Sequence, residues 1–185
     1  MPRTALDVAR RCLVLELLAQ RSVLEVDAEV PVADRERARA SWVGRETDLG
    51  VKDAIEPDER AWLDRAVGTL SDDDLDDVHG RGLGAVVLLW ALGRVESRPT
   101  LASVEDVLAD HGLLGDGSVA KARAAAEAAA LRSEAELDEA LSAYAKTRGK
   151  AKEVDDPERI FAGVAAHHLT WVLDPSMSFD DDVEV

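Results

Sequence analysis

The densest group of potential metal ligands in the sequence lies in residues 72–79, which read Asp-Asp-Asp-Leu-Asp-Asp-Val-His. A calcium loop of the helix–loop–helix type needs a glycine at its sixth position and a glutamate at its twelfth. A loop beginning at Asp72 would place Asp77 and Leu83 at those positions. We therefore interpret the cluster as the capped, solvated N-terminus of a helix, and we predict no metal site here.

A glycine-rich segment, Gly80-Arg81-Gly82-Leu83-Gly84, has the composition of a phosphate-binding loop but not its spacing. The dinucleotide fingerprint is G-x-G-x-x-G directly after a strand, and the Walker loop ends in lysine followed by serine or threonine. Glycines four apart on a helix, such as Gly80 and Gly84, let a neighbouring backbone approach closely. We interpret this segment as a packing or hinge position within a helix, and we predict no cofactor.

The remaining side chains that could take part in catalysis or bind a metal are the adjacent pair His167 and His168 and the single cysteine, Cys12. Adjacent helical residues point about 100° apart, so the pair is poorly placed to hold one metal ion. Cys12 lies among apolar residues, where cysteine usually serves as a small buried hydrophobe. We predict no catalytic, cofactor-binding or metal-ligating residue, and the sequence favours a protein that is not an enzyme.

The elements that would position these side chains are helices. Capping residues or prolines, each followed by apolar residues three to four apart, mark helix starts at Thr4, Pro31, Pro57, Ser71, Ser103, Ser118, Ser133 and Pro157. Residues 85–93 are apolar nearly all round and end in glycine, which predicts a buried central helix, with a short strand as the alternative. We expect a mainly α protein, a single irregular helical bundle over residues 1–174. An acidic tail, 175–185, is expected to fold back onto it or to be partly disordered.

The same periodicity predicts helix lengths and buried faces. One helix is expected from Pro31 to about Arg45, and another from Val119 to about Leu131. Residues 149–152 are expected to form a solvated connector, and Ile160 is expected to face the core. The four tryptophans, which lie on apolar helical faces, are expected to serve core packing: Trp42, Trp62, Trp90 and Trp171.

Charge and hydropathy restrict the partners and the compartment. The 185 residues include 38 acidic and 22 basic side chains, a formal net charge of -16. Such a surface repels the phosphates of nucleic acids and anionic lipids and attracts basic proteins. The longest apolar run, residues 85–92, is far shorter than the about 20 residues that span a bilayer. A twin-arginine-like pair, Arg10-Arg11, precedes an apolar stretch that Glu16 interrupts, which argues against export. We expect a cytoplasmic protein that binds neither nucleic acid nor membrane.

Three segments, in order along most of the chain, carry a family pattern. They read Ala-Arg-Arg-Cys-Leu-Val-Leu at 9–15 followed by Leu-Glu at 24–25, Val-Leu-Leu-Trp-Ala-Leu-Gly at 87–93, and Leu-Thr-Trp at 169–171 followed by Phe-Asp-Asp at 179–181. The pattern resembles the bacterial family called domain of unknown function number 4272. The resemblance implies a single helical domain without an assigned activity. Members often carry a charged, histidine-containing triplet and an asparagine where this chain has residues 164–166 and Thr170, so a polar site formed by those residues is not expected here.

Three functions are compatible with these observations. The leading hypothesis is a non-enzymatic interaction module whose acidic surface binds a basic protein, for example as its antidote or regulator. The second is an enzyme or small-ligand binder with a polar pocket near the central helix. Its candidate residues are Arg11, Arg81, His167, His168, Asp180 and Asp181. The third is a structural homo-oligomer that associates through an apolar helix face, which a strict monomer in solution would contradict.

Overall fold

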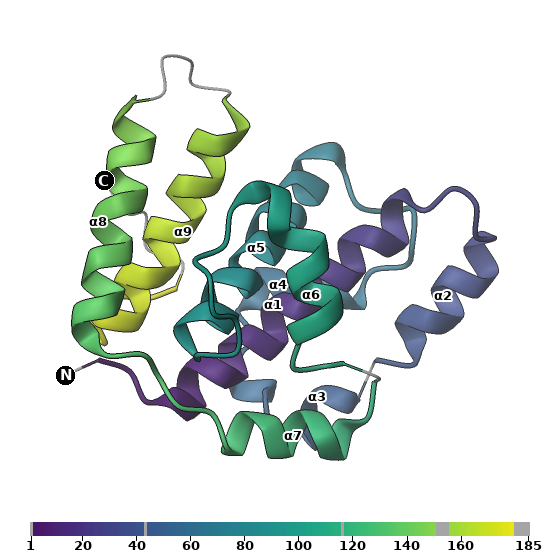
Figure 1. The fold of residues 1–185 in the computed structure, drawn as a ribbon. Helices are drawn as coiled ribbons and strands as arrows, with labels where there is room; N and C mark the ends of the chain where they lie inside the picture. The colour runs from purple at the N-terminus through teal and green to yellow at the C-terminus, as the bar shows by residue number, and fades with distance from the viewer. Residues whose placement is uncertain (1, 43, 116, 151–155, 180–185) are drawn as a thin grey trace.

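The computed structural model describes residues 2–42, 44–115, 117–150 and 156–179. These residues form a mainly α protein, a helical bundle in which the described residues contain no strand (Figure 1). The helices are α1 (Ala5–Val26), α2 (Val32–Ala40), α3 (Arg45–Leu49), α4 (Pro57–Asp64), α5 (Asp72–Ala91), α6 (Val104–His111), α7 (Val119–Glu127), α8 (Glu134–Lys150) and α9 (Pro157–Leu173), with 3₁₀ turns at η1 (Lys52–Ala54) and η2 (Leu101–Ser103).

Helices α1 and α5 form the centre of the bundle. They pack along each other, and α5 also contacts α4, α6 and α9. Residues 82–91 of α5 and 11–18 of α1 are all buried. The predicted central helix is therefore confirmed, as the second half of a longer helix that begins at Asp72. Gly93 follows it in a left-handed conformation (φ 67°), which agrees with the predicted glycine cap.

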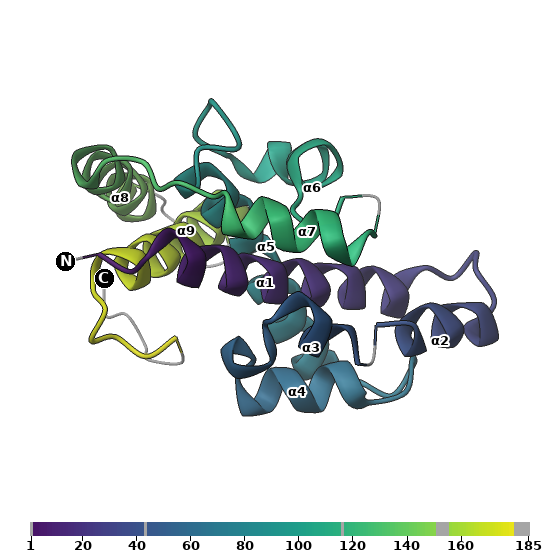
Figure 2. The ribbon, with the colours of Figure 1, turned by 90° about the horizontal axis from the view of Figure 1, so that it is seen from below.

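The outer helices form separate groups around this centre. Helices α8 and α9 pack against each other and stand at one end of the molecule, with α2 at the other end (Figure 1). Viewed from below, α6 and α7 lie on one side of α1, and α3 and α4 lie on the opposite side (Figure 2). Helix α1 is contacted by α5, α7, α4 and α2, and α5 in turn contacts α6 and α9, so that the two central helices together connect most of the bundle.

The glycines of α5 permit close packing at two of three positions. A Cβ added at Gly82 would lie 2.9 Å from the Cα of Ala19 in α1, so the two helices approach more closely there than a side chain allows. A Cβ at Gly84 would overlap the imidazole of His168. The packing interpretation is therefore confirmed for these two, whereas Gly80 faces open space and α5 continues through the segment without a hinge.

Two helices end earlier than predicted. Helix α2 ends at Ala40 rather than near Arg45, because the chain turns there and Gly44 adopts a left-handed conformation (φ 90°) before α3 starts. Helix α7 ends at Glu127 rather than near Leu131. The following chain is drawn to the central helix, where the Arg132 amide donates to the carbonyl of residue 91 (2.9 Å).

Three further details differ from the prediction. Gly149 and Lys150 belong to α8 rather than to a connector, and residues 151–152 lie outside the described residues. Ile160 is 51% exposed, whereas its neighbour Phe161 is buried and contacts the ring of Tyr144. Of the four tryptophans, three are buried, and Trp42 is only partly buried because it lies in the turn after α2.

Arginine side chains bind the main-chain carbonyls at the C-terminal ends of several helices, among them α1 and α4. The last carbonyls of an α-helix have no amide partner within that helix. Arg35 donates to the carbonyls of residues 24 and 25 at the end of α1 (2.6 and 3.0 Å). Arg39 donates to the carbonyls of residues 63 and 64 at the end of α4 (3.0 and 3.1 Å). These guanidinium groups therefore supply the donors that the helix ends lack.

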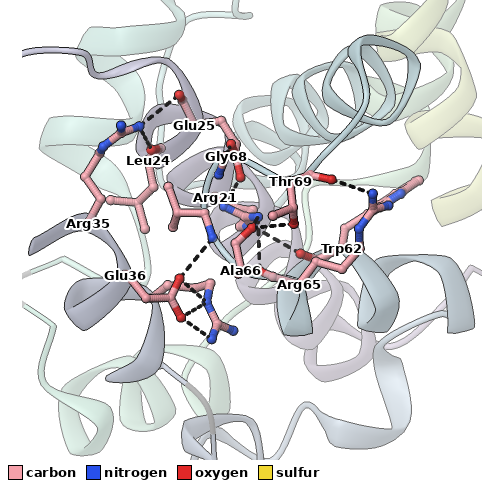
Figure 3. A network of polar contacts seen from close by, with 12 residues as sticks. Arg21, Leu24, Glu25, Arg35, Glu36, Trp62, Arg65, Ala66, Gly68 and Thr69 are labelled. Atoms are coloured by element: carbon pink, nitrogen blue, oxygen red, sulfur yellow. Dashed lines mark hydrogen bonds and ion pairs between the residues drawn. The ribbon is translucent and has the colours of Figure 1, made fainter. Parts of the chain in front are cut away.

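Arg21 performs the same role from inside the protein. Its fully buried guanidinium donates to the carbonyl of Trp62 (3.1 Å) and to those of residues 65 and 66 (3.2 Å each), and it forms an ion pair with Glu25 (Figure 3). The carboxylate of Glu25 also accepts from the amide of Gly68 (2.7 Å). Helix α1 is thereby tied to the chain that links α4 to α5.

We expect Arg21→Met to lower the free energy of unfolding by about 3 kcal/mol, because it leaves the buried Glu25 carboxylate without its ion pair. Urea unfolding followed by circular dichroism measures this loss. The control is Arg37→Met, which removes an exposed arginine paired with an exposed aspartate three residues away. That control should change the free energy by less than about 0.5 kcal/mol, and equal losses in the two variants would contradict the structural role of Arg21.

Candidate functional site

Four of the six candidate residues from the sequence surround one aromatic ring, that of Phe179. The guanidinium of Arg11 lies over this ring at 3.4 Å from its centroid, and that of Arg81 lies at 6.0 Å. The rings of His167 and His168 stand edge-on to it, with centroids 5.3 and 5.1 Å away. These four residues come from α1, α5 and α9, and the Phe179 ring occupies the space between them.

Phe179 ends a described segment that follows α9 and returns to the bundle. The carbonyl of Phe179 lies 3.0 Å from His167 Nε2. Arg3 donates to the carbonyl of Trp171 (2.8 Å) and to that of Met177. The first part of the predicted tail thus lies against α9 and the start of α1. The other two candidates, Asp180 and Asp181, lie outside the described residues.

A buried carboxylate, Glu59, holds the two candidate arginines in place. It accepts from both terminal nitrogens of Arg11, with one distance of 2.7 Å, and from Arg81 (3.0 Å). Its position follows from the start of α4, because Glu59 also accepts from the amide of Glu56 (3.0 Å) in a capping box. Sequence reasoning missed Glu59, although the Glu-Pro-x-Glu pattern at a helix start was the signal that could have indicated it.

His168 is neutral in this environment. Its Nδ1 lies 2.7 Å from the carbonyl of Val164, and Nε2 is buried without a hydrogen-bond partner among the described residues. Burial lowers the pKa of His168 to about 3, helped by His167 and by the positive charges of Arg11 and Arg81. Nε2 faces the backbone at Gly84, so this histidine is too weakly basic and too enclosed to act as a general base near neutral pH.

The acidic run at 72–79 is a helix start in the structure, as predicted. The Ser71 hydroxyl accepts from the amide of Asp74, and the Asp74 carboxylate accepts from the amide of Ser71 (3.1 Å) and from the indole of Trp62 (3.0 Å). The Ser71 hydroxyl also donates to the Asp74 carboxylate (2.6 Å), and this bond, followed by those from the Ser71 amide and the Trp62 indole, lowers the pKa of Asp74. Its charge therefore serves to cap the helix.

A separate apolar groove of about 480 Å³ lies along the C-terminal half of α1. This volume is within the range of ligand and side-chain binding sites. The groove is lined from α1, from α6 and from the chain around them by Glu16, Ala19, Gln20, Val23, Leu24, Trp42, Glu105, Leu108, Ala109, Leu114 and Gly115. A smaller cavity of about 70 Å³ shares Trp42 and Leu114 with it and continues toward α3 and α7.

Glu16 fixes one wall of this groove. Its carboxylate, which is buried, accepts from the amides of Leu113 and Leu114 (2.7 Å each) and so ties the loop after α6 to α1. Burial raises the pKa of Glu16, and the two amides oppose that rise. The sequence showed Glu16 only as an interruption in an apolar stretch, so the groove was not predicted.

The two long edges of the groove differ in chemistry. On α6, Glu105, Asp106 and Asp110 are exposed, and this helix carries no lysine or arginine. On α1, the side chains of Val23 and Val26 are 58% and 63% exposed. Of these three acids only Glu105 lines the groove, because Asp106 and Asp110 lie further round α6.

Comparisons with models of protein families, with curated proteins and with solved structures find no match to this chain. Within the described ranges, no three or more His, Cys, Asp or Glu side chains are grouped as a metal ion would require. No helix of the described residues is long and apolar enough to cross a bilayer. The family resemblance therefore stays a prediction.

Proposed function

We propose that this protein is a non-enzymatic interaction module that binds a basic protein. The observation that carries this proposal is that many of the arginines are bound to the main chain of the protein itself. Arginine supplies 17 of the 22 basic residues. Those that donate to main-chain carbonyls are Arg3, Arg11, Arg21, Arg35, Arg39, Arg65, Arg94 and Arg132. Guanidinium donors engaged in this way are not available to a partner.

Many of the acidic side chains, by contrast, face solvent. Exposed groups of them lie at the start of α5 (Asp72, Asp73, Asp76 and Asp77), on α6 (Glu105, Asp106 and Asp110) and on α8 (Asp138 and Glu139). A surface of this kind produces a negative potential that raises the association rate of a positively charged protein and disfavours a negatively charged one. The exposure of these acidic side chains thus favours a basic partner, as the net negative charge of the chain does.

The rival functions have less support. In the polar cluster around Phe179, an aromatic side chain of the protein itself fills the space that a small ligand would need. Association of two identical copies would bring together two surfaces that each carry a net charge of -16. The same charge opposes binding to the phosphates of nucleic acids and membranes.

Binding to the physiological partner is expected to weaken by about tenfold or more when salt rises from about 50 mM to about 300 mM, because screening shortens the range of surface charges. The partner is first isolated by affinity capture of the tagged full chain from its native lysate and identified by mass spectrometry. Isothermal titration calorimetry then gives the Kd at each salt concentration. Capture without a stoichiometric basic protein, or a Kd that salt leaves unchanged, would contradict the proposal.

A further inference from the structure

We infer that the groove between α1 and α6 is the docking site for an amphipathic helix of the basic partner. The apolar face of that helix enters the groove, and its lysine or arginine side chains meet the acids of α6. This inference rests on the proposed function and adds the place and the chemistry of recognition. Helix-in-groove binding of this type uses apolar anchors at helical spacing.

The bundle leaves an apolar strip of α1 uncovered beside the groove. Val23 and Val26 are three residues apart on α1, and both side chains are more than half exposed. They continue the apolar lining that Leu24 and Leu108 provide inside the groove. An exposed apolar strip with a polar border is typical of a protein-binding surface.

The α6 edge of the groove is acidic and complements basic side chains on a bound helix. Glu105 lines the groove together with Ala109, four residues later on the same face of α6. Asp106 and Asp110, also four residues apart, extend the negative charge along the helix. Arg94 donates to the carbonyl of His111 at the C-terminal end of α6 (3.0 Å). A lysine or arginine on the bound helix would therefore find the carboxylate of Glu105 at the edge of the groove.

Charge disfavours two other occupants of the groove. A second copy of the chain would place one acidic edge against another acidic surface, at a cost that rises as the salt concentration falls. The C-terminal residues of the same chain read Asp-Asp-Asp-Val-Glu-Val at 180–185, and their charge opposes binding beside α6. An amphipathic helix with basic side chains complements both the apolar lining of the groove and its acidic border.

The groove is preformed. The hydrogen bonds from Leu113 and Leu114 to Glu16 hold its wall in place without a ligand. At Gly112, a Cβ would lie 2.7 Å from the carbonyl of Leu108, so only glycine permits this tight return of the chain. Preformed sites lose little free energy to ordering when a partner binds.

Ala109→Arg tests the site, because Ala109 is exposed, lines the groove and lies in a helix that tolerates arginine. The control is Ala120→Arg, which makes the same change at an exposed position of α7 outside the groove. The probe is a synthetic helical peptide of leucine and lysine, with leucines at i, i+3, i+4 and i+7. A scrambled peptide of the same composition measures attraction by charge alone. Fluorescence anisotropy gives the Kd of each pair.

The amphipathic peptide should bind the parent protein and Ala120→Arg equally, and Ala109→Arg at least about tenfold more weakly. It should also bind the parent protein more tightly than the scrambled peptide does. Equal affinity for the two variants, or for the two peptides, would overturn the inference. So would a dimer of the parent protein, detected by analytical ultracentrifugation, that Ala109→Arg dissolves, because the occupant would then be a second copy.

The captured partner separates this inference from the proposed function. If the partner binds both variants with the same salt-dependent Kd, the groove is not its site and the interaction module stands. If no basic partner is captured, the proposed function itself is contradicted.

As a second check, neutralising Glu105, Asp106 and Asp110 to their amides should reduce the salt dependence of binding. Neutralising Glu134, Asp138 and Glu139 on α8, an equal change of charge outside the groove, should reduce it less.

Discussion

Glu59→Ala is expected to lower the free energy of unfolding by about 3–5 kcal/mol, the range for breaking a buried ion pair by removing one partner. The Glu59 carboxylate is fully buried and balances the guanidinium of Arg11, which is almost as deeply buried, together with that of Arg81. Its loss leaves two positive charges in a region where water cannot reach Arg11. It also removes the acceptor that completes the start of α4.

The measurement is equilibrium unfolding in urea, with Glu127→Ala as the control. Glu127 pairs with an arginine four residues away in α7, and both side chains are largely exposed, so its loss should change the free energy by less than about 0.5 kcal/mol. The double variant Arg11→Met, Glu59→Leu should recover much of the stability, because apolar groups often replace a buried pair without net cost. A loss at Glu59 no larger than at Glu127 would show that the buried pair does not stabilise the fold.

The positions of helix starts could be predicted from the sequence because their determinants are local. Thr4, Ser71 and Pro157 each act within the first turn of the helix that follows, and α1, α5 and α9 begin where these residues predict. Helix ends were less predictable. Helix α7 ends because Arg132 binds the end of α5, a contact between segments about forty residues apart, which no local pattern reports.

The surroundings of the candidate residues depend on contacts that are still more distant. Arg11 and Glu59 are separated by 48 positions, so the pattern that predicted Arg11 as a candidate gave no indication of the carboxylate that binds it. The groove requires that Glu16 reach the amide of Leu113, 97 positions later. In the sequence this residue is an isolated acid in an apolar run. Its role follows only from the way in which α6 and its loop return to α1.

Gly84→Ala is the second substitution with a large expected effect, a loss of about 3 kcal/mol in the free energy of unfolding. The new Cβ would lie 1.9 Å from Nε2 of His168 and 2.3 Å from its Cε1, so the imidazole would have to move. The ring is held by its contact with the carbonyl of Val164 and by its edge-on packing against Phe179. Displacing it would also disturb the segment that carries Phe179.

Two companion variants separate this overlap from the general effect of alanine in a helix. A Cβ at Gly80, in the same helix, would meet no atom within 4 Å, so Gly80→Ala should raise the free energy of unfolding by about 0.5–1 kcal/mol. Adding His168→Ala to Gly84→Ala removes the overlapping ring and should restore part of the loss. Thermal unfolding of Gly84→Ala, Gly80→Ala and the double variant, each compared with the parent protein, measures these changes in stability. A Gly84→Ala protein as stable as Gly80→Ala would mean that α5 and α9 do not approach as closely as the imidazole contact requires.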